Sequence, residues 1–141
     1  MIIDHIGIVV KSISVGISLW EDIFGYSQHT QPVVNSRQKV KVVFLSKKDS
    51  LPVKLVEPID QDSSVFRFAQ KGGGLHHLCF RCGDVTTQVN ILQKKDVRIL
   101  APPQPGEAFD NEKIAFVYAK NCLNIELIDT EKRAGVISIE E

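Results

Sequence analysis

The sequence predicts an α+β fold, in which tandem βαβββ modules form one curved mixed sheet with a central cup. Three observations support this prediction. Several blocks of the 141-residue chain recur at an offset of 72 positions, and each half shows the same order of strand-like and helix-like segments. A module of about 60 residues would also bury too little apolar surface to be stable alone, so the halves should share a core.

The repeat is carried by three pairs of segments at one offset: 5–8 with 77–80, 41–45 with 113–117, and 53–57 with 125–129. Segments 24–40 and 96–112 do not align, as expected of loops. We therefore expect a single domain over residues 1–141, divided into a first module at 1–60, a connector at 61–73, a second module at 74–130 and a C-terminal tail at 131–141.

The first half begins with a strand over 2–10, because this segment is rich in Ile and Val. A helix should follow, with Ser12 or Ser14 as its N-cap and Gly25 as its stop, since its apolar residues recur with a period near 3.6. Strands at 39–46 and 52–57 complete the first module.

The second half is predicted to repeat this order. Its helix should start at Gly83-Asp84 and run to about Lys95. Its strands are expected at 75–82, 97–100, 113–119 and 124–129.

The remaining segments are predicted to be mostly irregular. Segment 101–112 contains three prolines and should therefore form a long loop without regular structure. A short helix is expected around 64–70 in the connector, and a short final strand at 135–139 in the tail.

Composition excludes several classes of function. Seventeen Lys and Arg balance seventeen Asp and Glu, so the chain lacks the basic excess that nucleic-acid binding usually needs. No apolar stretch approaches the ~20 residues of a membrane span, and the N-terminus shows no signal peptide. We expect a cytoplasmic protein whose partner is a small molecule rather than nucleic acid or a membrane.

Strand alternation places three ionisable residues at the cup. His5 lies opposite the apolar face of Ile6 and Ile8, which the helix should cover, and the repeat puts His77 in the equivalent place. Glu126 falls on the cup face of its strand, where burial is costly unless the carboxylate is paired or binds a cation. This set would suit Zn, Co, Ni, Mn or Fe. The alternatives are hydrogen-bonded core histidines and an ion-paired Glu126.

The other chemistry-bearing residues suggest no second site. Cys79 and Cys82 spell C-x-x-C, but residues three apart in a strand point to opposite faces and cannot share a metal ion. With Cys122 they make an odd number of cysteines, which suits reduced thiols. His76 is expected to point away from the cup, and His29 to lie solvated in a loop.

Five short motifs occur along the chain in an arrangement known from other proteins. They are Asp-His-Ile-Gly at 4–7, Leu-Val-Glu-Pro at 55–58, Asp-Ser-Ser at 62–64, Gly-Gly-Leu-His-His at 73–77 and Ile-Glu-Leu at 125–127. Together they resemble the vicinal oxygen chelate superfamily, which includes glyoxalase I, methylmalonyl-CoA epimerase and ring-cleaving dioxygenases. The resemblance covers nearly the whole chain and is nearest to methylmalonyl-CoA epimerases and lactoylglutathione-lyase-like proteins.

The resemblance implies a glyoxalase-like fold and a divalent metal held by His5, His77 and Glu126. The family's fourth ligand, a Gln or Glu four residues before the proline, is replaced here by Lys54, which the repeat pairs with Glu126. A protonated lysine would repel a divalent cation and could instead pair with Glu126. Alternatively, Lys54 extends to the cup rim and leaves the metal untouched. Where some epimerases carry an acid in the preceding strand, this chain has Val42.

Three functions are compatible with these residues. The first is a glyoxalase-like, metal-dependent isomerase or lyase, of the methylmalonyl-CoA epimerase or lactoylglutathione lyase type. It would stabilise the enolate of a small carbonyl or thioester substrate, with Glu126 and Lys54 as catalytic residues. The second is an Fe(II) dioxygenase with a two-His-one-Glu triad. The third is a metal-free small-molecule binding protein of the same fold. A homodimer is consistent with each, since relatives often pair.

Overall fold

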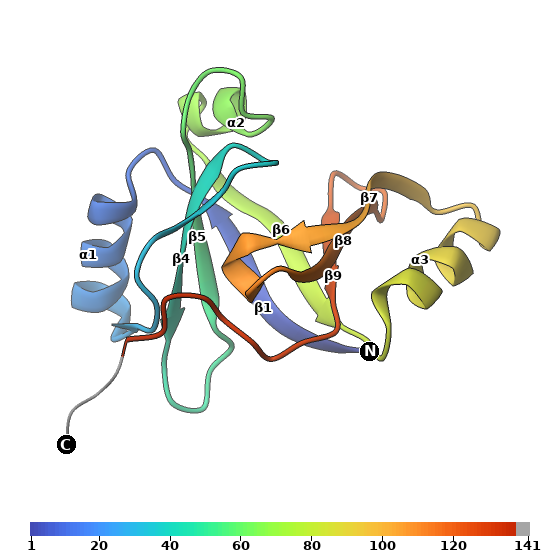
Figure 1. The fold of residues 1–141 in the computed structure, drawn as a ribbon. Helices are drawn as coiled ribbons and strands as arrows, with labels where there is room; N and C mark the ends of the chain where they lie inside the picture. The colour runs from blue at the N-terminus through green and yellow to red at the C-terminus, as the bar shows by residue number, and fades with distance from the viewer. Residues whose placement is uncertain (138–141) are drawn as a thin grey trace.

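In the computed structural model, which describes residues 1–137, the chain forms a nine-stranded mixed sheet with the order β2-β4-β5-β1-β6-β9-β8-β7, and β3 pairs with β4 (Figure 1). The strands are β1 (Ile2–Val9), β2 (Ser27–Gln28), β3 (Val33–Asn35), β4 (Val40–Ser46), β5 (Val53–Pro58), β6 (Gly74–Arg81), β7 (Arg98–Gly106), β8 (Glu112–Tyr118) and β9 (Asn124–Ile128). The helices are α1 (Ile13–Phe24), α2 (Phe66–Gln70), α3 (Val85–Lys94) and the 3-10 helix η1 (Glu107–Phe109).

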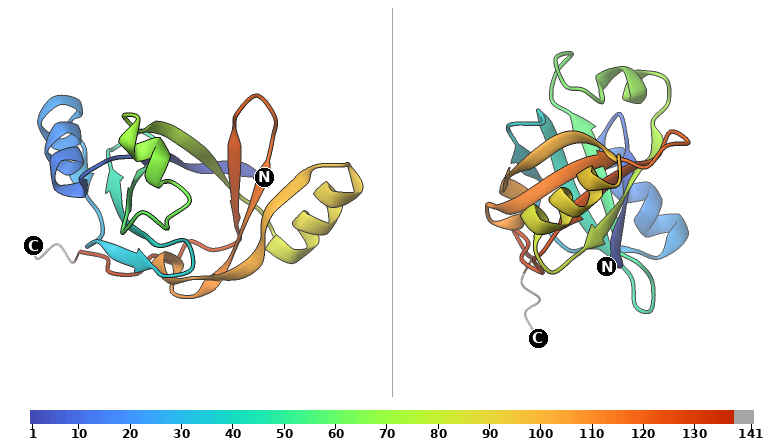
Figure 2. Two further views of the ribbon diagram at one scale, coloured as in Figure 1. Left: turned by 90° about the horizontal axis from the view of Figure 1, so that it is seen from above. Right: turned by 90° about the vertical axis from the view of Figure 1, so that its right-hand side faces the viewer.

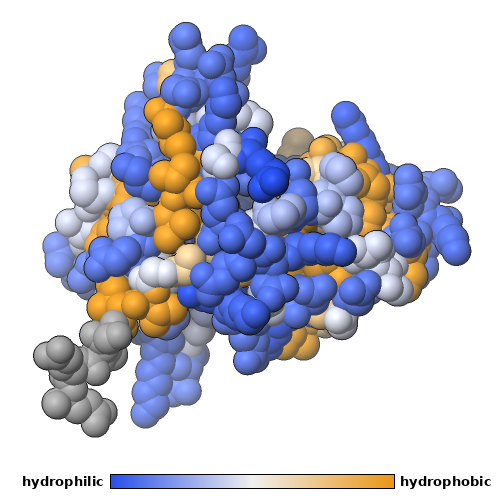
Figure 3. Space-filling view, viewed as in Figure 1, coloured by the Kyte–Doolittle hydropathy of each residue, from blue (hydrophilic) through white to orange (hydrophobic). Residues whose placement is uncertain are grey.

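The sheet is strongly curved, and α1 and α3 lie at its two opposite ends (Figures 1 and 2). Two apolar clusters join these helices to the convex face: one includes Val43 and Leu55 near α1, the other Val85 and Leu127 in and beside α3. A third cluster, which includes Phe44 and Phe109, fills part of the concave side. The α+β fold with a curved mixed sheet is thus confirmed. The face seen in Figure 3 is mostly hydrophilic, with apolar side chains in smaller patches.

The two halves meet at the antiparallel pair of β1 and β6, and each of these strands pairs in parallel with a strand of its own half. The parallel register is the same in both halves: Gly7 of β1 stands opposite Lys54 of β5, and Cys79 of β6 stands opposite Glu126 of β9. The repeat seen in the sequence is therefore also a repeat of strand pairing, and it places Lys54 and Glu126 at equivalent positions.

The prediction of an irregular loop over 101–112 is wrong, because β7 continues to Gly106 and is followed by η1. The prolines are tolerated for two reasons. β7 is the last strand of the sheet, so one of its edges needs no hydrogen-bond partner. Pro102 and Pro103 also lie where the register with β8 shifts, between Ala101 and Gln104.

Smaller elements differ from the expectations in detail. β2 and β3 lie in the segment 24–40 that was expected to be a loop, whereas the connector helix α2 forms as expected. In the tail, Val136 bridges to Thr30, and the rest of the expected final strand, at 138 and 139, lies outside the described residues. In the described part of the chain, no helix has both the length and the apolar character needed to cross a membrane.

Asp84 caps the start of α3, since its Oδ2 accepts a hydrogen bond from the backbone N–H of Thr87 at 2.8 Å. We expect Asp84→Ala to lower the free energy of unfolding by about 1 kcal/mol, because a helix-terminal N–H loses its acceptor. Asp84→Asn should cost much less, since the amide oxygen can accept the same bond. Urea unfolding of the three proteins checks this, and equal losses for both variants would contradict it.

Candidate functional site

The four central strands carry the side chains that sequence reasoning singled out. His5 lies on β1, Lys54 on β5, His77 on β6 and Glu126 on β9, and all are at most 2% exposed. The structure brings all four together inside one chain. Alternation along the strands produces this convergence, because the flanking residues Ile125 and Leu127, like Ile8, pack under the helices instead.

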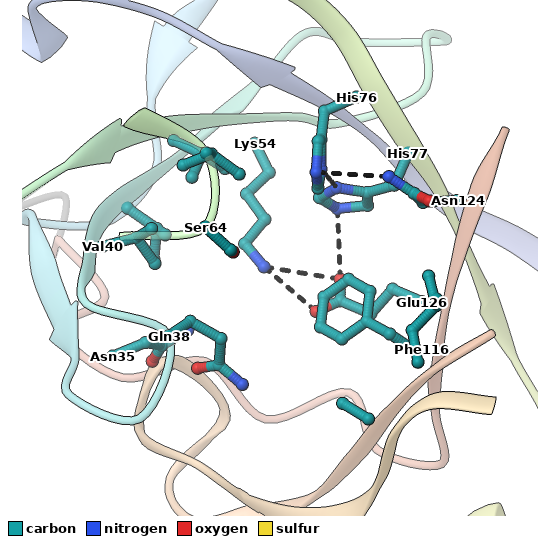
Figure 4. Close-up of a pocket in the computed structure, with 15 residues that line it drawn as sticks. Asn35, Gln38, Val40, Lys54, Ser64, His76, His77, Phe116, Asn124 and Glu126 are labelled. Atoms are coloured by element: carbon teal, nitrogen blue, oxygen red, sulfur yellow. Dashed lines mark hydrogen bonds and ion pairs between the residues drawn. The ribbon is translucent and has the colours of Figure 1, made fainter. Parts of the chain in front are cut away.

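Glu126 lies at the centre of this cluster and contacts the other three side chains. Its Oε1 lies 3.0 Å from His5 Nε2 and 3.4 Å from His77 Nε2, and the second contact is not a hydrogen bond. The Lys54 ammonium donates to both carboxylate oxygens, at 3.1 Å to Oε2 and 3.4 Å to Oε1 (Figure 4). Lys54 therefore forms the ion pair with Glu126 and does not extend to the rim.

Ionisation in the cluster is set by burial and by these contacts. Burial alone would raise the pKa of Glu126, but the Lys54 ammonium and the hydrogen bond from His5 outweigh it and hold that pKa well below its usual value. Burial lowers the pKa of His77, and burial with the neighbouring His77 and Lys54 lowers the pKa of His76 to about 4. Near neutral pH, Glu126 is a carboxylate and these two imidazoles are neutral.

His76 faces the cup, so the prediction that it points away is wrong. The register between β1 and β6 shifts where His76 is the extra residue, and a bulge of this kind breaks alternation and turns the side chain toward that of His77. Their Nδ1 atoms lie 2.8 Å apart, and His76 Nε2 lies 3.3 Å from Asn124 Nδ2. A second shift at Asp4, the position equivalent to His76 in the repeat, brings the Asp4 carboxylate 2.7 Å from His5 Nδ1.

Asp4 and Arg133 support His5 from behind the cup, and sequence reasoning assigned neither a role. Arg133 donates a hydrogen bond to Asp4 and lies over the rings of Phe44 and Phe109, 4.7 and 4.8 Å from their centroids. Burial raises the pKa of Asp4, but the His5 hydrogen bond and the Arg133 charge outweigh it and the net shift is downward. Arg133 comes from the tail, where no periodic pattern could have indicated it.

A cavity of about 360 Å³ opens onto this cluster, a size within the usual range for small-molecule sites. The lining includes Lys54, His76, His77 and Glu126, with Asn35, Gln38, Ser64 and Asn124 as further polar groups and mainly apolar walls, including Val42, elsewhere (Figure 4). Among these lining residues, Glu126 is the only carboxylate. Gln38 Nε2 is buried without a hydrogen-bond partner, so it has a free donor for a bound molecule.

The cysteines show no shared site in the described residues, as the strand geometry predicted. Cys79 is buried on the concave side and Cys82 packs in the cluster beside α3. Asp4, His5 and Cys79 do lie near one another, but burial strongly raises the pKa of the Cys79 thiol, which leaves it protonated and a poor ligand.

This burial predicts the order in which the thiols react. In the folded protein, Cys122 is exposed and should be alkylated by iodoacetamide first, Cys82 more slowly, and Cys79 only after unfolding. Mass spectrometry of peptides after timed labelling, with and without urea, checks this order. Fast labelling of Cys79 in the folded state would show that the concave side is more open than described.

The comparisons with known proteins agree with this geometry. The model of the Glyoxalase/Bleomycin resistance protein/Dioxygenase superfamily matches residues 4–116. An uncharacterized protein of Bacillus subtilis (strain 168), YqjC, is 36% identical over 130 residues, covering 90% of this chain and 91% of that protein. The mitochondrial methylmalonyl-CoA epimerase of Homo sapiens is 26% identical over 132 residues, covering 92% of this chain and 73% of the epimerase.

Solved structures give the same result. Methylmalonyl-CoA epimerase from Mycobacterium tuberculosis superposes with a TM-score of 0.80 at 27% identity, covering 90% of this chain and 86% of that one. A methylmalonyl-CoA epimerase in complex with methylmalonyl-CoA and NH4+ also gives 0.80 at 27% identity, with coverage of 96% and 97%. On its sequence match and on its fold, this chain belongs to the glyoxalase/bleomycin resistance protein/dioxygenase superfamily.

Proposed function

We propose that this protein is an epimerase-type isomerase that moves a proton at the carbon next to the carbonyl of an acyl-CoA thioester. The observation that carries the proposal is the Glu126–Lys54 pair at the wall of a cavity otherwise poor in charge. The relatives named as methylmalonyl-CoA epimerases and the neighbour solved with methylmalonyl-CoA support the substrate class.

The two charged groups have complementary tasks. The Glu126 carboxylate takes the proton from the carbon, and the electrons of that C–H bond move onto the thioester oxygen to give a planar enolate. The Lys54 ammonium donates a hydrogen bond to that oxygen as its negative charge develops, and Gln38 Nε2 is a second free donor in the cavity. A proton delivered to the opposite face of the planar enolate, by a water molecule in the cavity, inverts the carbon and restores the thioester. Glu126 then passes the proton that it took to the hydroxide left by that water, which restores the carboxylate for the next cycle.

The cup fits the divalent metal implied by the family only in part. His5, His77 and Glu126 have donor atoms within 4.8 Å of one another, an arrangement that can hold a metal ion. Lys54, however, places a positive charge against the same carboxylate. A single and a double positive charge about 4 Å apart repel by about 8 kcal/mol at an effective dielectric constant of about 20. The same repulsion would apply to an iron(II) triad. No step of the proposed mechanism uses a metal ion.

A second candidate function is small-molecule binding without turnover. It is favoured by Val42, which leaves the cavity with one carboxylate and with an apolar wall where some epimerases have an acid. The Glu126–Lys54 pair would then contribute to ligand recognition and not to proton transfer.

One experiment separates the two. A single stereoisomer of methylmalonyl-CoA is incubated with the protein in D2O, and solvent deuterium at the carbon is followed by mass spectrometry, with binding measured by calorimetry. Exchange above the buffer rate supports the isomerase. Binding without exchange supports the binding protein. If the protein neither binds nor exchanges this ester, the proposed substrate class is wrong, and a glutathione hemithioacetal tests the lactoylglutathione lyase type next.

A further inference from the structure

Each carboxylate around the cup already has a cation beside it without a metal ion. Two carboxylates, Asp4 and Glu126, face two cations, Arg133 and Lys54, before any charge on the histidines is counted. Asp4, Lys54, Glu126 and Arg133 have side chains 10% exposed or less. A divalent cation added here would leave two positive charges buried without compensation, which is costly in a protein interior.

Hydrogen bonds also hold the two neighbouring histidines in place beside Glu126. The Asn124 amide nitrogen can only donate, so His76 Nε2 accepts from it and His76 carries its proton on Nδ1. His76 Nδ1–H then donates to His77 Nδ1. The Nε2 of His77 faces Glu126 at 3.4 Å without forming a hydrogen bond.

Both oxygens of Glu126 are engaged as well. Oε1 accepts from His5 and from Lys54, and Oε2 accepts from Lys54. The carboxylate is thus held by the Lys54 ammonium. Lys54 occupies the position on β5 that is equivalent to the position of Glu126 on β9.

We infer that the Lys54 ammonium takes the place of a divalent metal in this cup, so that the protein binds no such ion there. Lys54 neutralises Glu126 and presents N–H groups to an anionic oxygen of the bound molecule. This last task rests on the proposed function, whereas the exclusion of the metal depends only on the charges and hydrogen bonds described above.

Co²⁺ is a suitable probe, since its visible absorption reports ligation by His and carboxylate independently of activity. We expect no bound Co²⁺ in the wild type after gel filtration. Lys54→Gln, which replaces the ammonium with a neutral amide oxygen donor, should bind one Co²⁺ per chain at least about 100-fold more tightly than the wild type, a difference of about 2.7 kcal/mol. The double variant Lys54→Gln/His77→Ala should lose this ion, which would place it in the cup.

Lys54→Met provides a second test in case Lys54→Gln does not fold. It removes the charge without adding a ligand, and circular dichroism with thermal unfolding establishes the fold of each protein before titration. If Lys54→Gln is unfolded, Lys54→Met should still bind Co²⁺ more tightly than the wild type, through His5, His77 and Glu126.

Two results would overturn the inference. One is stoichiometric Co²⁺ or Zn²⁺ in the wild type that is lost in His77→Ala. The other is equal Co²⁺ affinity in the wild type and in the folded Lys54 variants. Neither measurement involves a substrate, so the inference can hold even if the thioester assay is negative. If that assay is positive, deuterium exchange by the wild type should be unchanged by EDTA.

Discussion

Gly7→Ala is expected to destabilise the protein by about 1–3 kcal/mol or more, because it overpacks a filled interior. Gly7 stands opposite His77 across β1 and β6. A Cβ at position 7 would clash with Cε1 and Nε2 of the His77 ring, so that something would have to move. The imidazole has little room to withdraw, since its ring lies 5.7 Å from that of Phe116 and 5.8 Å from that of His5. Urea unfolding measures the loss.

The clash can be tested by a double-mutant cycle. In Gly7→Ala/His77→Ala the new methyl group enters the space that the ring has left, so the two changes should cost at least about 1 kcal/mol less together than the sum of the single variants. Gly83→Ala is the matched control, because a Cβ there meets nothing within 4 Å. A Gly7→Ala protein as stable as the Gly83→Ala protein would contradict the packing described for His77.

Glu126→Gln should abolish most of the proposed activity and also weaken the fold. Loss of the proton acceptor is expected to slow deuterium exchange by about 10²–10⁴-fold. The neutral amide would leave the Lys54 ammonium buried without a counter-charge, which typically costs about 3–5 kcal/mol. The exchange assay and urea unfolding measure the two effects separately.

Two further variants serve as controls for Glu126→Gln. Glu112→Gln removes a surface carboxylate that pairs with Lys132 at 2.7 Å, and it should change stability by less than about 1 kcal/mol. Glu126→Gln/Lys54→Met removes both buried charges and should recover much of the lost stability while remaining inactive. If Glu126→Gln were as stable and as active as Glu112→Gln, the Glu126–Lys54 pair would have neither proposed role.

The elements that position the site could be predicted where local patterns govern the backbone. The repeat and the two-residue period of the strands were enough to expect His5, His77 and Glu126 on one face. They also placed Lys54 at the position equivalent to Glu126, but they left open whether it pairs with Glu126 or extends to the rim. These expectations depend only on which face of a strand a side chain occupies, and tertiary packing does not change that in an unbroken strand.

The same reasoning failed where the strands are not regular. The extra residues at Asp4 and His76 break the alternation, and they bring two side chains to the site that a strict two-residue period sends away from it. The prolines of β7 led to the expectation of a loop where the chain forms a strand. Proline is tolerated in a strand that has a neighbour on one side only, and the sequence does not show that β7 is such a strand. Arg133 reaches Asp4 through tertiary contact alone.

The matching register of Lys54 and Glu126 bears on the ancestry of the two halves. Two copies of the N-terminal half, paired as β1 and β6 pair now, would set two ammonium groups against each other, and two copies of the C-terminal half would oppose two carboxylates. Like charges at such a buried contact disfavour self-association. A symmetric pair of either half would therefore need a different residue at this position, and the present halves are not interchangeable there.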